Sequence, residues 1–289
     1  MNPSQPNSSR PVMTFLLLLL GLSGIFYWLI IGADASSGGA GLYSLGLMWC
    51  PGIAAIATLL INRRSLKELG WTWGKTSYQW RSYLIPFLYT AIAYLVIWIM
   101  GWGRFYNEET VEKLSGMFGA EAMSDEMVIA LYVLIYGVLG IIPGAIMALG
   151  EEIGWRGFLV PELMKTQGYV KTSLLIGLLW GLWHLPLLLF GEYNSGTSAW
   201  FSAPCFLTLT LGVSFVYTWF RIQSGSLWTA VFLHASHNLF VQEIFSPLTA
   251  DAGFTEYFVG EFGVALPVVV LGFAVYFWNK RDELPALAQ

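Results

Sequence analysis

Charged side chains are scarce in this sequence. They account for 11% of the 289 residues, whereas 56% of the residues are hydrophobic. An ordinary soluble domain carries roughly a quarter charged residues, so the composition excludes a water-soluble protein of that kind. It indicates an integral membrane protein, for which the lipid bilayer is one expected partner. No nucleic-acid partner is expected.

Cysteine and long polar stretches are scarce as well. Cys50 and Cys205 both lie in or near apolar runs, as buried small hydrophobic residues do. Neither a disulfide nor a cysteine metal cluster is indicated. The longest polar stretches are residues 1–11, 62–81 and 102–126, and none of them indicates a soluble domain. We therefore treat residues 1–289 as a single polytopic membrane domain.

Apolar runs, by contrast, are abundant, and each is close to the length of about 20 residues that crosses a bilayer as a helix. The runs lack the alternating pattern of a transmembrane barrel. The predicted spans are residues 12–32, 42–61, 82–101, 127–150, 171–190, 200–220, 226–246 and 260–279. The predicted fold class is all-α, with a single bundle of about eight transmembrane helices.

The basic residues predict an orientation, because Lys and Arg gather in cytoplasmic loops. A cytoplasmic N-terminus leaves only Arg104 and Lys113 outside, and eight spans then return the C-terminus to the cytoplasm. The basic residues expected inside are Arg10, Arg63, Arg64, Lys67, Lys75, Arg81, Arg156, Lys165, Lys171, Arg221, Lys280 and Arg281. Short loops and the lack of a transit peptide favour a bacterial inner membrane.

The first span raises the alternative of a cleaved signal peptide. Ala33-Asp34-Ala35 could serve as a signal-peptidase site. The apolar run before it is longer than a signal-peptide core of about 7–15 residues, which favours an uncleaved membrane anchor.

The segment "ALGEEIGWRGFLVPEL" places two acids and an arginine in an apolar stretch. On a helix, Glu152 and Arg156 lie about 40° apart and can pair, whereas Glu151 lies about 140° from Arg156 and points toward neighbouring helices. A buried carboxylate without a charged partner can exchange a proton with water near neutral pH. The alternative is a surface salt bridge at the cytoplasmic end of a helix, with Glu151 solvated. We expect this helix to end near Val160, before Pro161.

All three histidines fall inside predicted spans, where polar groups are costly and are functional candidates by default. A single histidine in an apolar helix, such as His184 in "LLWGLWHLPLLL", is more often structural. In "VFLHASHNLF", His234 and Asn238 are four apart on one face and can aim two donors at a developing oxyanion. His237 lies about 60° to the other side of His234, where it either contributes or holds a helix contact.

The same side chains allow a metal site. Glu151, His184 and His234 would supply one carboxylate and two imidazoles, as catalytic zinc sites do. The HExxH spacing is absent. A divalent metal such as zinc is thus compatible with the sequence but not required by it, and no cofactor is firmly predicted.

Three motifs together resemble one known family. EEIGWR fits an EExxxR motif, HASHN fits HxxxN, and WGLWH stands where the family often has FxxxH, with Trp180 in place of phenylalanine. On these motifs the chain resembles the CPBP intramembrane proteases, which include the type II CAAX prenyl endopeptidases and the Abi proteins linked to bacteriocin immunity. The motifs lie between residues 148 and about 240, and we place the family core within 120–245.

The resemblance implies an intramembrane endopeptidase acting on a membrane-associated peptide or protein, with or without a lipid group. It implies that Glu151 and His184 activate a water molecule and that His234 and Asn238 hold the oxyanion. Glu152 and Arg156 would shape the site or contact the substrate. The family has been described both as metalloproteases and as metal-free glutamate proteases. We favour the second, because each residue already has a role without an ion.

Two other classes of function remain. A non-catalytic scaffold or immunity-type protein could keep the same fold without proteolysis. A proton-coupled transporter could use Glu151 and the histidines as a relay, but the paired acids have no counterpart in the other half of the chain, which argues against an inverted-repeat transporter.

Overall fold

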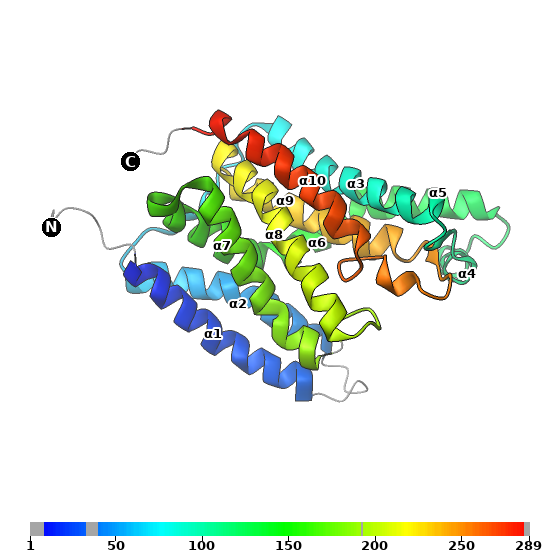
Figure 1. The fold of residues 1–289 in the computed structure, drawn as a ribbon, viewed down its shortest axis with the longest axis horizontal. Helices are drawn as coiled ribbons and strands as arrows, with labels where there is room; N and C mark the ends of the chain where they lie inside the picture. The colour runs from blue at the N-terminus through cyan, green and yellow to red at the C-terminus, as the bar shows by residue number, and fades with distance from the viewer. Residues whose placement is uncertain (1–8, 33–39, 192, 286–289) are drawn as a thin grey trace.

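Helices dominate the computed structural model, which describes residues 9–32, 40–191 and 193–285 (Figure 1). The α-helices are α1 (Ser9–Gly32), α2 (Ala40–Ile61), α3 (Thr76–Ile99), α4 (Glu108–Phe118), α5 (Asp125–Leu139), α6 (Ile141–Glu152), α7 (Val160–Phe190), α8 (Ala199–Ser224), α9 (Leu227–Asn238) and α10 (Ala265–Asn279). Two short strands, β1 (Arg104–Phe105) between α3 and α4 and β2 (Thr249–Ala250) after α9, pair with each other in the antiparallel sense. The predicted all-α class is confirmed.

Within the described ranges, five helices are long and apolar enough to cross a membrane. One of them is the 50-residue stretch Ile141–Phe190. That stretch joins α6 and α7, whereas α5, α9 and α10 are each 15 residues or shorter. Each of the eight predicted apolar runs is largely helical. The multi-pass membrane character is therefore clear, while the count of eight and the sides of the termini stay predictions. The candidate cleavage site at Ala33–Ala35 lies outside the described residues.

The bundle is arranged around α6 and α9. The helix α6 packs against α2 on one side and α9 on the other, and α9 in turn packs against α3. The outer pairs are α1 with α2, α7 with α8, and α8 with α10 (Figure 1). Of the motif-bearing helices, α6 and α9 thus lie at the centre of this arrangement, and α7 packs mainly against α8.

Glycines allow the central helices to approach closely. Gly150 and Gly154 form a small-xxx-small pair that flanks the two acids, and a Cβ on Gly154 would lie 2.7 Å from the backbone carbonyl oxygen of Pro51 in α2. Gly177 and Gly181 in α7 allow α8 to approach closely in the same way. A Cβ on Gly177 would lie 2.6 Å from the Cα of Leu211 in α8. At Gly150, Gly154 and Gly177 the missing side chain lets the backbones meet directly, whereas at Gly181 it leaves room for side chains of α8. The motif residues are thereby brought toward one another.

Two π-helices follow the motif residues directly. Ile153–Leu159 begins immediately after Glu152, and Leu239–Phe245 begins immediately after Asn238. Single-turn π segments in α-helices often occur at functional sites.

The expected helix end before Pro161 is wrong. The chain stays helical through Pro161 because the π-helix runs directly into α7. The carbonyl of Arg156, five residues before the proline, accepts instead from Nε of Arg221 at 2.9 Å. The helical conformation is instead interrupted at Gly168, with φ 67° and ψ 171°.

Replacing Gly154 with alanine should destabilise the bundle by about 1–3 kcal/mol, because the new methyl group would overlap backbone that cannot rotate away. Gly24→Ala in α1 is the matched control, since a Cβ there meets nothing within 4 Å. Thermal unfolding in detergent, followed by circular dichroism, compares the two. Equal melting temperatures for both variants would contradict the close approach of α2 and the π-helix.

Candidate active site

Four predicted catalytic residues line one cavity of about 220 Å³. Glu151 comes from the end of α6, His184 from α7, and His234 and Asn238 from α9. Helices α2 and α8 complete much of the wall with apolar side chains. A second cavity shares Met48, Asn238 and Gln242 with the first, so the two adjoin.

Glu151 is buried in this wall, with 2% of its surface exposed. Its Oε2 accepts a hydrogen bond from Nε1 of Trp180 at 2.7 Å. The alternative of a solvated Glu151 beside a surface salt bridge is therefore wrong. Trp180 stands at the aromatic position of the second motif, and its indole provides a donor that a phenylalanine lacks.

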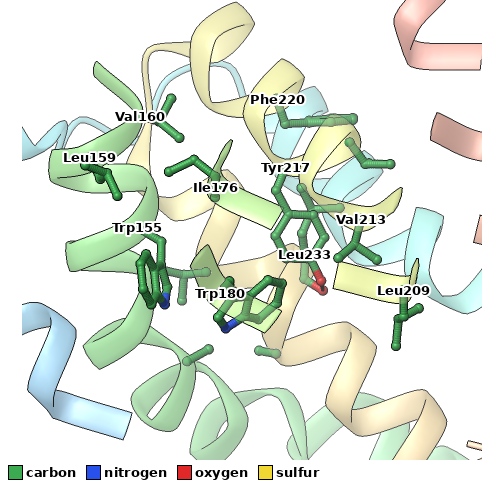
Figure 2. Close-up of a cluster of buried hydrophobic side chains, with 14 of the residues drawn as sticks. Trp155, Leu159, Val160, Ile176, Trp180, Leu209, Val213, Tyr217, Phe220 and Leu233 are labelled. Carbon is green, nitrogen blue, oxygen red and sulfur yellow. Dashed lines mark hydrogen bonds between the residues drawn. The ribbon is translucent and has the colours of Figure 1, made fainter. Parts of the chain in front are cut away.

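Glu152 and Arg156 form the predicted ion pair, with Nη1 2.8 Å from Oε1 and both side chains fully buried. The guanidinium also lies over the rings of Trp180 and Tyr217, at 4.4 and 4.7 Å from their centroids. Figure 2 shows these two rings within the buried hydrophobic cluster of the bundle. A buried pair of this kind is stable only because further contacts replace the lost water. Neither residue lines the cavity, so the ion pair affects the cavity only indirectly, through neighbouring side chains.

His234 is the link between that pair and the cavity. Its Nδ1 lies 2.9 Å from Oε1 of Glu152, the same oxygen that accepts from Arg156. Because a carboxylate only accepts, Nδ1 carries the proton and Nε2 remains for the cavity. The sequence predicted the pairing of Glu152 with Arg156 but missed this bond, which depends on how α6 and α9 are rotated against each other.

His184 is oriented by its own helix and by aromatic neighbours. Its Nδ1 donates to the backbone carbonyl of Trp180 at 3.0 Å, which again leaves Nε2 free to face the cavity. Trp183 and Phe206 lie 4.7 and 4.9 Å from its ring, and the ring of Tyr193 stacks on it at 6.0 Å. Trp180 thus holds both Glu151, through its indole, and His184, through its carbonyl.

His237 contacts the cavity through a separate network. Its Nδ1 lies 2.7 Å from the hydroxyl of Tyr89, and its Nε2 lies 3.0 Å from Oε1 of Glu261. Glu261 also lines the cavity but was missed by the sequence reasoning. The available signal was a single acid at the start of the last predicted apolar run, where no motif marks it.

The predicted metal ligands do not gather in the observed arrangement. Within residues 9–32, 40–191 and 193–285, no group of three His, Cys, Asp or Glu side chains is placed to hold a metal ion. Glu151, His184 and His234 share the cavity wall, but Glu151 is bonded to Trp180 and His234 to Glu152. These hydrogen bonds engage Oε2 of Glu151 and Nδ1 of His234, so it is the spacing of the described side chains that does not form a three-ligand metal centre.

Comparisons with known proteins agree with the three motifs. Residues 126–240 match the family model described as type II CAAX prenyl endopeptidase Rce1-like. A protein named CAAX prenyl protease 2 from Methanococcus maripaludis is 32% identical over 94 residues, covering 31% of this chain and 34% of that protein. The match thus spans about a third of the relative's length. The resemblance to the CPBP/CAAX protease family that the motifs predicted is confirmed over this segment, which contains all six predicted site residues.

Glu152→Ala should destabilise the protein by about 3–5 kcal/mol, because it leaves the Arg156 guanidinium buried without its counter-ion. Glu151→Gln should change stability far less, since the amide oxygen still accepts from Trp180. Chemical unfolding of both variants in the same detergent measures the difference. Similar losses for the two substitutions would show that Arg156 does not depend on Glu152.

Proposed function

We propose that this chain is an intramembrane endopeptidase that hydrolyses peptide bonds of membrane-associated substrates. The observation that carries the proposal is the convergence of Glu151, His184, His234 and Asn238, from three helices, on one cavity within an apolar bundle. The family match over residues 126–240 supports the same class of reaction. The adjoining second cavity, which shares Met48, Asn238 and Gln242 with the first, supplies further space beside these side chains.

The reaction begins with a water molecule between Glu151 and His184. Since Trp180 occupies Oε2 of Glu151, Oε1 is the oxygen that takes the water proton, and Nε2 of His184 accepts the second water hydrogen and orients the nucleophile. The water oxygen attacks the peptide carbonyl carbon, and a tetrahedral intermediate forms. Glu151 then returns its proton to the peptide nitrogen, and the C–N bond breaks.

His234 and the amide of Asn238 stabilise the negative charge on the former carbonyl oxygen. For His234 to donate through Nε2 while Nδ1 donates to Glu152, both ring nitrogens must carry protons. The carboxylate of Glu152 is the counter-ion for that imidazolium. Arg156 pairs with the same carboxylate and fixes its position, so the buried pair serves the reaction through His234.

The mechanism needs no metal ion, because the base, the water-orienting group and the oxyanion donors are all side chains. We propose that the substrate is cleaved near its C-terminus or in a membrane-adjacent segment. We also propose that the protein lies in a bacterial inner membrane, with both of its termini in the cytoplasm.

Glu151→Gln and, separately, His184→Ala should lower proteolysis on the order of 10²–10⁴-fold, the usual contribution of a positioned acid–base group. Mass spectrometry of membrane peptides from cells expressing equal amounts of each protein measures this. The control is Glu109→Gln, which alters an exposed carboxylate on α4. Peptide profiles identical to wild type for both Glu151→Gln and His184→Ala would favour a non-catalytic scaffold.

Removal of divalent metals should leave the activity of the purified protein unchanged, because the base, the water-orienting group and the oxyanion donors of the proposed reaction are all side chains. Activity is measured before and after dialysis against EDTA. A loss that added zinc restores would assign a metal to the reaction and overturn the metal-free mechanism.

A further inference from the structure

Glu261 is a cavity-lining carboxylate that the proposed reaction does not use. It lies in the segment between β2 and α10, is 6% exposed, and falls outside the residues that match the family model. It shares the cavity with Glu151, so two acids from different parts of the chain face one space.

The hydrogen bonds of Glu261 leave one acceptor position of its carboxylate unoccupied. Its Oε1 accepts from Nε2 of His237 and from Nε2 of Gln242, each at 3.0 Å. Its Oε2 accepts from the hydroxyl of Tyr193 at 3.2 Å. A carboxylate has about four acceptor positions, so three donors leave one, on Oε2. Three donors on one carboxylate also favour its ionised form, which only accepts.

His237 does not have to neutralise this charge. The hydroxyl of Tyr89 lies 2.7 Å from Nδ1 and can donate to it, so a neutral imidazole with its proton on Nε2 satisfies both partners. None of the described residues that line the cavity is a lysine or an arginine. Arg156 lies behind the wall, paired with Glu152. The cavity therefore offers a negative acceptor without a lysine or arginine beside it, and the imidazolium proposed for His234 already has Glu152 as its counter-ion.

The free acceptor lies within reach of a substrate at the reacting centre. Tyr193 stacks its ring on His184 and donates its hydroxyl to Glu261, so one tyrosine side chain separates the two groups. His234 and His237 are three residues apart on α9, which is a rise of about 4.5 Å. An extended peptide advances about 3.3–3.6 Å per residue. A side chain one or two positions from the scissile bond can thus reach Glu261.

We propose that Glu261, with Gln242 and Tyr193, forms a specificity subsite that binds a cationic side chain, Lys or Arg, within two residues of the scissile bond. A donor there completes the fourth acceptor position of the carboxylate, whereas the free carboxylate of a substrate's C-terminus meets a like charge. The inference rests on the proposed function and names the class of substrate that the site selects.

Internally quenched peptides test the subsite with protein reconstituted in liposomes. In each pair, one position near the scissile bond holds either lysine or norleucine, which has a similar length but no charge. Wild type should cleave the lysine peptide with kcat/KM at least about tenfold higher at one position, as a charge-assisted hydrogen bond predicts. Glu261→Gln should bring that ratio close to one. Glu256→Gln, in the same segment but away from the cavity, should leave it as in wild type.

Two results would overturn the subsite. One is that wild-type protein cleaves the lysine and norleucine peptides equally at every position, a result that can be obtained without any variant. The other is a Glu261→Gln protein that keeps the full preference. If that variant does not purify as a folded protein, Glu261→Asp replaces it; its shorter side chain should reduce the ratio, and an unchanged ratio again overturns the subsite. Failure of the proposed function gives a different result. In that case either no peptide is cleaved, or Glu151→Gln leaves the cleavage unchanged.

Discussion

A single carboxylate oxygen holds this site together. Oε1 of Glu152 accepts from Arg156 within its own helical segment and from His234 across the bundle. In an apolar interior, a charge that loses any partner becomes costly, so the three side chains persist as a unit. The position of α9 against α6, and with it the position of His234 in the cavity, follows from this arrangement.

Close backbone packing is what allows so short a connection. Gly150 and Gly154 bring α2 against the segment that carries the acids, and the π-helix after Glu152 changes the rotation of the chain before α7 begins. On the other side, Gly177 and Gly181 let α8 approach α7, and α8 supplies the Tyr217 ring over Arg156. Small residues and a widened helical turn thus serve the polar contacts as much as the apolar ones.

Sequence reasoning predicted what depends on a single helix. The angular spacing of Glu152 and Arg156 was sufficient to predict their pairing, and the scarcity of charge predicted the membrane bundle. It did not predict the bond from His234 to Glu152, because a helical wheel does not specify how two helices are rotated against each other. It also misplaced a helix end at Pro161, because the preceding π-helix continues into α7 without a break. Glu261 was missed because it is a single acid at the start of the last predicted apolar run, where no motif marks it.

Trp180 has a role beyond packing. Its indole N–H is bonded to Oε2 of Glu151, and its backbone carbonyl is bonded to His184. Each gain or loss of a proton at Glu151 alters the charge directly beside the indole, and the fluorescence of an indole responds to a nearby charge. The residue that replaces phenylalanine in the motif therefore places an intrinsic fluorophore, one of the 14 tryptophans of the chain, directly beside the carboxylate that is proposed to carry the proton.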